Sequence, residues 1–128
     1  MNAGASALLV AEPGPLRDSL YTMLSEILQI GITSQASDAD SAWKAIADLN
    51  PYLVLLDVSM GYDQVISVVN GLGTKALKCR SLVLADTIHQ KAEIESAGAD
   101  IVLIKGFPAE KLYEALVQLL SAQEPDVL

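Results

Sequence analysis

The chain has 128 residues, of which 52% are hydrophobic and 19% are charged, and it carries a formal net charge of −8. This length and composition predict one globular domain with a sizeable hydrophobic core and exclude a disordered chain. Only eight residues are basic against sixteen acidic ones, which argues against a nucleic-acid-binding surface.

The cellular setting is indicated by three further features. Cys79 is the single cysteine, so no disulfide framework exists and a reducing compartment fits best. Residues 1–4 lack the basic region and apolar run of a signal peptide. No apolar stretch has the length of a membrane span. We therefore expect a cytoplasmic protein that contacts neither membrane nor nucleic acid.

Alternating strand and helix patterns begin with an apolar run at residues 7–11, which ends at Glu12 and predicts a strand. The segment Pro13-Gly14-Pro15 breaks this strand and puts Pro15 in the first turn of a helix. That helix carries an apolar stripe at helical spacing, formed by Leu16, Leu20, Leu24, Ile27 and Leu28.

A second strand is predicted at residues 30–36, where weak alternation of apolar and polar residues is typical of a sheet edge. Ser37 or Asp38 can cap the next helix, which closes at Asn50-Pro51. The apolar residues of this helix are Trp43, Ile46 and Leu49.

The central stretch is an uninterrupted apolar run from Tyr52 to Leu56 that stops at Asp57. Such a run predicts a strand buried on both faces, as in a parallel sheet covered by helices. Asp57 would then lie at the carboxyl end of the strand, where open α/β sheets gather their ligand-binding loops. An aspartate at a strand end also has plainer roles, since it can solvate a loop or cap the next helix.

After the central strand, Gly61-Tyr62-Asp63 opens a helix that we expect to stop around Gly71-Leu72-Gly73. A fourth strand follows at residues 81–85 and ends at Asp86. Residues 87–97 form a short polar helix.

The last strand covers residues 101–104 and ends at Lys105. Pro108 then starts a helix whose apolar face is formed by Leu112, Leu116, Leu119 and Leu120. We expect residues 1–128 to form a single domain with a core at about 7–120, and residues 121–128 to be a frayed tail or the start of a linker.

Five strands that alternate with five helices predict right-handed crossovers and a parallel sheet with helices on both faces. At this size the common solution is the flavodoxin-like, doubly wound (βα)5 fold of the α/β class, with strand order 2-1-3-4-5. In that order, the carboxyl ends of the first, third and fifth strands bring Glu12, Asp57 and Lys105 around one shallow cleft.

These three residues suggest a chemistry. Two carboxylates close together repel each other and favour a hard divalent cation such as Mg²⁺ between them. Lys105 would supply a second positive charge for an incoming phosphoryl group. Asp57 closes the most buried strand and is therefore the natural nucleophile towards phosphorus, giving an aspartyl-phosphate.

The chain from about Ala7 to Leu120 resembles the receiver domain of two-component response regulators, the CheY-like family. The motifs that carry this resemblance are residues 53–60 for the phosphoacceptor strand, Gly98-Ala99-Asp100 and Leu103-Ile104-Lys105 for the last strand, and Leu16-Arg17 in the first helix. The resemblance implies that Asp57 is the phosphoacceptor and that Lys105 contacts the phosphate. It also implies that Glu12, Asp57 and the backbone carbonyl of Ser59 hold Mg²⁺.

Several positions depart from the family pattern. Receivers usually carry two adjacent acidic residues after the first strand, whereas this chain has Ala11-Glu12, so a weakened Mg²⁺ site is expected. The hydroxyl usual at the end of the fourth strand is replaced by Ala85, and the aromatic switch residue of the fifth strand by Val102. A relay from hydroxyl to aromatic residue therefore lacks both ends, and Thr87 is expected to cap a helix instead.

Two functions follow. The first is a receiver domain in a phosphorelay, a signalling domain and not an enzyme, which accepts a phosphoryl group on Asp57 from a histidine kinase or a histidine phosphotransfer protein. The second is a degenerate receiver that acts as a protein-protein interaction module with weak or no phosphorylation. A homodimer through the face formed by residues 87–97, 101–104 and the last helix is compatible with its mixed charges. A flavin-binding electron carrier on the same fold is disfavoured because Glu12-Pro13-Gly14-Pro15 is acidic and rigid.

Overall fold

The computed structural model of the chain describes residues 5–27, 30–74 and 79–121. Along these residues, strands and helices alternate as the sequence predicts. In chain order the elements are β1 (Ala5–Val10), α1 (Pro15–Ser25), β2 (Ile30–Ala36), α2 (Ala39–Leu49), β3 (Leu53–Asp57), the 3-10 turn η1 (Val58–Met60), α3 (Tyr62–Thr74), β4 (Arg80–Ala85), α4 (Ile88–Ala97), β5 (Ile101–Ile104) and α5 (Ala109–Ser121).

Within the described ranges, the strands form one parallel sheet in the order β2-β1-β3-β4-β5. The flavodoxin-like α/β fold with this order is the fold predicted from the sequence. β2 lies at one edge, as its weak alternation indicated, and β3 lies in the centre. All residues of β3 are buried, which explains why its sequence is a continuous apolar run.

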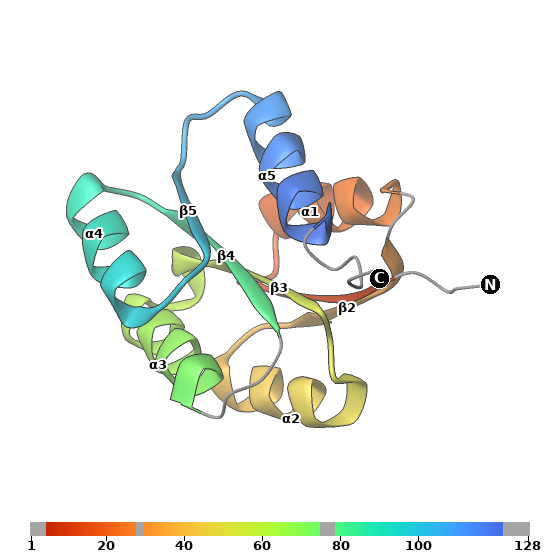
Figure 1. Ribbon diagram of the computed structural model, residues 1–128, viewed down its shortest axis with the longest axis horizontal. Helices are drawn as coiled ribbons and strands as arrows, with labels where there is room; N and C mark the ends of the chain where they lie inside the picture. The colour runs from red at the N-terminus through yellow and green to blue at the C-terminus, as the bar shows by residue number, and fades with distance from the viewer. Residues whose placement is uncertain (1–4, 28–29, 75–78, 122–128) are drawn as a thin grey trace, which may run out of the picture.

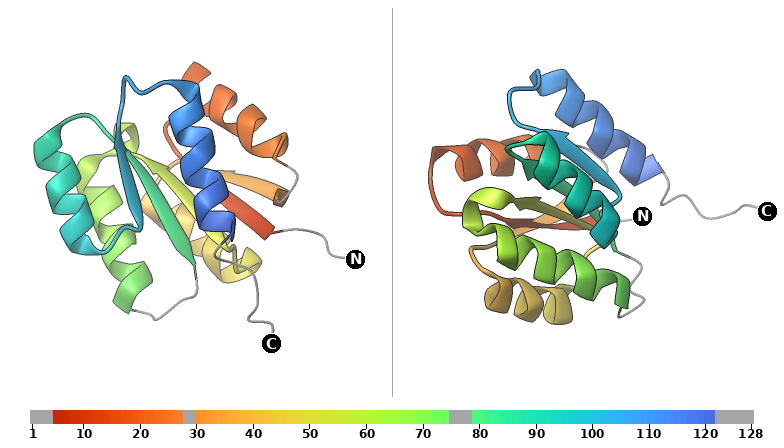
Figure 2. Two further views of the ribbon diagram at one scale, coloured as in Figure 1. Left: turned by 45° about the horizontal axis from the view of Figure 1, so that its top comes forward. Right: turned by 90° about the vertical axis from the view of Figure 1, so that its left-hand side faces the viewer.

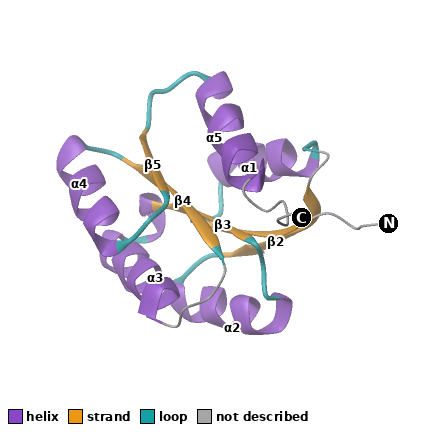
Figure 3. Ribbon diagram, viewed as in Figure 1, coloured by secondary structure: helices purple, strands orange, loops and turns teal. Residues whose placement is uncertain are grey.

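The helices form a layer on each face of the sheet (Figures 1 and 3). Helices α1 and α5 cover one face, and α2, α3 and α4 cover the other, as the two further views in Figure 2 also show. Side chains alternate between these layers along each strand. Leu53 and Leu55 belong to the cluster under α1 and α5, whereas Val54 and Leu56 belong to the cluster under α2, α3 and α4.

The helix starts follow the predicted capping chemistry. Pro15 occupies the first position of α1. At α2, the backbone N–H of Ser41 donates a hydrogen bond of 2.8 Å to Oδ1 of Asp38, and the backbone N–H of Asp38 donates one of 3.3 Å to the Ser41 hydroxyl. The backbone and side-chain hydrogen bonds from Ser41 lower the pKa of Asp38. Helix α1 ends at Ser25. Ile27, predicted for the apolar stripe of this helix, is buried but lies after the helix end. Leu28, predicted for the same stripe, lies outside the described residues.

Helix α3 ends at Thr74, one residue beyond the predicted stop around Gly71-Leu72-Gly73, but Gly71 itself lies inside the helix. Gly71 faces the indole of Trp43 on the neighbouring helix α2. A Cβ atom built at Gly71 would lie 2.3 Å from Cζ2 of Trp43, closer than any real contact, whereas one built at Gly73 meets nothing within 4 Å. Gly71 therefore permits close packing of α2 against α3 and does not end the helix.

The segment expected to be a tail or a linker, residues 121–128, lies outside the described residues except for Ser121, the last residue of α5. Among the helices that the structure describes, none combines the length and the apolar character that a membrane crossing needs.

The contact between Gly71 and Trp43 can be tested by a matched pair of substitutions in α3. We expect Gly71→Ala to lower the free energy of unfolding by about 1–3 kcal/mol, because the added methyl group overpacks the interface with Trp43. Gly73→Ala should raise it by about 0.5–1 kcal/mol, because alanine favours the helix and meets no neighbour. Urea denaturation measures both, and equal effects of the two variants would contradict the packing role of Gly71.

Candidate functional site

Asp57 is a buried carboxylate at the carboxyl end of the central strand. Its side chain is only 1% exposed. Oδ1 accepts a hydrogen bond of 3.0 Å from the backbone N–H of Ser59, which makes Asp57 the cap of η1. Oδ2 is also buried, and it has no hydrogen-bond partner among the described residues. The carboxylate is thus held in place by one oxygen while the other remains available.

Lys105, the first residue after β5, provides the charge that balances Asp57. Its Nζ atom lies 2.6 Å from Oδ1 of Asp57. The backbone N–H of Lys105 donates a hydrogen bond of 2.8 Å to the carbonyl of Ala85, which fixes the end of β5 against β4. The structure therefore brings together two of the three residues that the sequence placed in one cleft.

The pKa of Lys105 is raised above its ordinary value of 10.5. Burial of the side chain opposes this by lowering the pKa, but the carboxylates of Asp57 and Asp86 outweigh burial. The ammonium is thus charged at neutral pH. Its contribution to stability is complete below the unfolded-state pKa and is lost as the pH rises through the higher folded-state pKa.

Asp86 is a member of the cluster that the sequence interpretation did not assign to the site. Its Oδ1 atom lies 3.3 Å from Nζ of Lys105, and its side chain is 54% exposed. Alternation along β3, β4 and β5 places Asp57, Asp86 and Lys105 on the face covered by α1 and α5. The presence of Asp86 in the site could have been predicted from the sequence, because three adjacent parallel strands are each closed by a charged residue.

Glu12 follows β1, on the other side of β3 from Lys105. β1 pairs with β3 up to the partners Val10 and Leu56, so Glu12 follows at the same edge of the sheet. The backbone N–H of Ala11 donates a hydrogen bond of 3.0 Å to the carbonyl of Ala36, which extends the pairing of β1 with β2 by one residue. Glu12 is exposed, and among the described residues it forms no ion pair or hydrogen bond with Asp57 or Lys105.

Within residues 5–27, 30–74 and 79–121, no group of three or more His, Cys, Asp or Glu side chains is arranged to hold a metal ion. The oxygen atoms that remain for a hard cation are the free Oδ2 of Asp57, the carboxylate of Glu12 and backbone carbonyls such as that of Ser59, an exposed residue of η1.

Aliphatic side chains occupy the positions where the family carries a hydroxyl and an aromatic residue. Ala85 is fully buried and Val102 is 4% exposed, and both belong to the cluster under α2, α3 and α4. The hydroxyl of Thr87 accepts a hydrogen bond of 3.1 Å from the backbone N–H of Gln90. Thr87 therefore caps α4, as predicted, and does not replace the hydroxyl absent at position 85.

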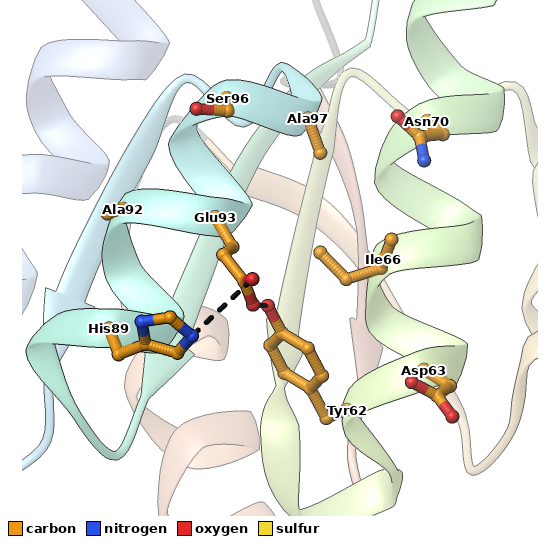
Figure 4. A pocket seen from close by; sticks show the side chains of 9 residues that line it. All are labelled: Tyr62, Asp63, Ile66, Asn70, His89, Ala92, Glu93, Ser96 and Ala97. Atoms are coloured by element: carbon orange, nitrogen blue, oxygen red, sulfur yellow. Dashed lines mark hydrogen bonds and ion pairs between the residues drawn. The ribbon is translucent and has the colours of Figure 1, made fainter.

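A groove of about 620 Å³ lies between α3 and α4, away from Asp57 (Figure 4). There the carboxylate of Glu93 lies between His89, whose Nε2 is 3.5 Å away, and the hydroxyl of Tyr62, which donates a hydrogen bond to it. The Glu93 hydrogen bond, followed by burial and nearby negative charge, raises the pKa of Tyr62 to about 12. His89 is largely exposed.

The chain was compared with known proteins. No protein-family model matches it. It is 26% identical over 121 residues to the nitrate/nitrite response regulator protein NarL of Escherichia coli (strain K12). The matched residues make up 93% of this chain and 56% of that protein. The chain thus spans about half the length of this curated relative.

Solved structures agree with this similarity. The structure of NtrX from Brucella abortus in complex with ATP superposes on this chain with a TM-score of 0.79, and the two sequences are 26% identical. The match covers 93% of this chain and 27% of the NtrX chain. The receiver domain of the Francisella response regulator 1452 has a TM-score of 0.74 and 20% identity over 94% of this chain and 100% of that chain. The fold and the resemblance to response regulator receiver domains, both predicted from the sequence, are confirmed.

The ion pair between Asp57 and Lys105 makes a testable contribution to stability. We expect Lys105→Met to lower the free energy of unfolding by about 3 kcal/mol, because it leaves the buried Asp57 carboxylate without its cation. The same substitution in an Asp57→Asn background should cost clearly less, because no buried charge is then left unpaired. A double-mutant cycle by urea denaturation measures the coupling, and equal costs in both backgrounds would contradict it.

Proposed function

Because the chain has the receiver fold and resembles response regulators of two-component signalling, we propose that it is a phosphoaccepting receiver domain. Its phosphodonor would be a histidine kinase or a histidine phosphotransfer protein. The observation that carries this proposal is the state of the Asp57 carboxylate. One oxygen is fixed by Lys105 and by the N–H of Ser59, and the other is buried and has no partner among the described residues.

The proposed reaction is a phosphoryl transfer to Oδ2 of Asp57. A bond forms between this oxygen and phosphorus, and the bond between phosphorus and the imidazole nitrogen of the donor's phosphohistidine breaks. The imidazole leaves with the electron pair and takes up a proton. Lys105 offsets the negative charge that the phosphoryl group brings, since its ammonium already lies 2.6 Å from the other oxygen of Asp57.

The residues around Asp57 also fit a weakly held Mg²⁺, which receiver domains generally bind. We propose that Glu12, Oδ2 of Asp57 and the backbone carbonyl of Ser59 would hold it. A bound Mg²⁺ would neutralise charge on the transferred phosphoryl group. The two carboxylates provide fewer acidic ligands than the usual set, because Ala11 stands where a second acidic residue is usual.

A second candidate function is a degenerate receiver that acts as a protein-protein interaction module. Two observations favour it, namely the buried aliphatic side chains of Ala85 and Val102 in place of the switch residues, and the almost complete burial of Asp57. In either case, we propose that the chain is a signalling domain that does not turn over a substrate. We also propose that it is cytoplasmic and that residues 1–128 form one domain.

We further propose that the face formed by α4, β5 and α5 is the surface for a homodimer. On α4, Lys91 forms an ion pair of 2.7 Å with Glu95 of the same helix. On α5, Lys111 and Glu114 are exposed. Opposite charges that alternate on one face can pair with a second copy of the same face.

Phosphorylation distinguishes the two candidate functions. Incubation with acetyl phosphate and Mg²⁺ should give an adduct with the mass of one phosphoryl group, detected by mass spectrometry of the intact protein. We expect the adduct to disappear in Asp57→Asn and to persist in the control Asp48→Asn, which removes a charge from the exposed end of α2. If no adduct forms at any Mg²⁺ concentration, the interaction module is favoured.

The metal site can be tested by restoring the missing carboxylate. We expect Ala11→Asp to strengthen Mg²⁺ binding by about tenfold, because an added carboxylate raises the attraction for a hard cation by about 1.4 kcal/mol. Calorimetric titration of both proteins with MgCl₂ measures the change. The same gain from a control substitution, Ala47→Asp on the exposed surface of α2, would show that net charge and not the site is responsible.

A further inference from the structure

Asp86 shares the ammonium of Lys105 with the phosphoacceptor. Nζ of Lys105 lies 2.6 Å from Oδ1 of Asp57 and 3.3 Å from Oδ1 of Asp86. Strand β4, which ends just before Asp86, lies between β3 and β5. One cation is therefore divided between two carboxylates, of which one is buried and the other half-exposed.

This arrangement is fixed by the backbone on both sides. The N–H of Asp86 donates a hydrogen bond of 2.8 Å to Oε1 of Gln90, in the first turn of α4, and Thr87 caps the same helix. The N–H of Lys105 donates one of 2.8 Å to the carbonyl of Ala85. The two backbones cannot separate without losing these bonds, so the fold fixes the starting points of the Asp86 and Lys105 side chains next to each other.

We propose that Asp86 is a positioning residue that holds the Lys105 ammonium in the resting protein and competes with the phosphoryl group for it. The proposal rests on the proposed function of Asp57 as phosphoacceptor. Asp86 would thereby lower the affinity of Asp57 for a phosphoryl group and shorten the lifetime of the adduct.

The charges explain the competition. A phosphoryl group on Asp57 brings about −1.5 to −2 charges at neutral pH and needs the ammonium that Asp86 contacts. Asp86 is a like charge beside this group and repels it. Because the Asp86 side chain is 54% exposed, solvent screens the repulsion, and we expect an effect of about twofold to fivefold.

The first test measures how firmly Asp86 holds Lys105 and requires no phosphorylation. The protein is treated with a limiting amount of acetic anhydride at neutral pH, and acetylation of Lys105 is quantified by peptide mass spectrometry against the exposed Lys44. We expect Asp86→Asn to raise the ratio of Lys105 to Lys44 acetylation by about twofold to fivefold. The charge-matched control Asp48→Asn should leave the ratio unchanged.

The second test measures the competition with beryllofluoride, which mimics a phosphoryl group on a carboxylate. Calorimetric titration in the presence of Mg²⁺ compares the wild type, Asp86→Asn and Asp48→Asn. We expect Asp86→Asn to bind beryllofluoride about twofold to fivefold more tightly than the other two proteins. The phosphoryl adduct formed with acetyl phosphate should also decay more slowly in this variant.

The outcomes separate the two proposals. An unchanged acetylation ratio in Asp86→Asn, or wild-type affinity for beryllofluoride in this variant, overturns the role of Asp86. If none of the three proteins binds beryllofluoride or forms an adduct, the proposed function itself is contradicted and Asp86 has no phosphoryl group to compete with. In that case the acetylation ratio of Lys105 to Lys44 still shows whether Asp86 holds the Lys105 ammonium.

Discussion

The site depends on keeping a single charge, that of Asp57, inside an apolar sheet. A carboxylate that is 1% exposed at the end of a fully buried strand is costly unless a cation and hydrogen bonds satisfy it. Lys105 supplies the cation from β5 and Ser59 supplies an N–H from η1. Both partners depend on the parallel sheet, because only this topology brings the ends of β3 and β5 to the same edge with one strand between them.

Most of the fold could be predicted because its determinants are local. The continuous apolar run of β3, the proline at the start of α1 and the Asp38 cap of α2 each act within a few residues. Gly71 shows where local information ends. Its sequence context predicts a helix stop, but its actual role depends on the indole of Trp43, which comes from another helix 28 positions earlier in the sequence. Packing between helices cannot be derived from the pattern of either helix alone.

For the site, too, the sequence predicts the features that depend on the order of strands but not those that depend on single contacts. Strand ends located Asp57 and Lys105, because topology brings them to one edge whatever the loops do. Topology does not determine which carboxylates the ammonium contacts. This depends on the path of the chain just beyond each strand, where Oε1 of Gln90 accepts a hydrogen bond from the backbone N–H of Asp86 and the Asp86 carboxylate contacts Lys105. These are contacts of single side chains and backbone groups that a hydrophobic pattern does not record.

The residues Ala11 and Asp86 together determine how charge is distributed around Asp57. Ala11 removes a carboxylate from the β1 side of Asp57, where Glu12 remains for a cation, and Asp86 adds one on the β4 side, against Lys105. One acidic residue therefore follows β1 where two are usual, and one acidic side chain lies against the lysine. Coulomb attraction then favours a tightly held lysine, and the proposed Mg²⁺ would be held weakly. In the proposed phosphoryl transfer, the incoming group would have to displace a carboxylate from Lys105 before it could use the ammonium. This distribution of charge would then stabilise the resting protein at the expense of the phosphorylated one.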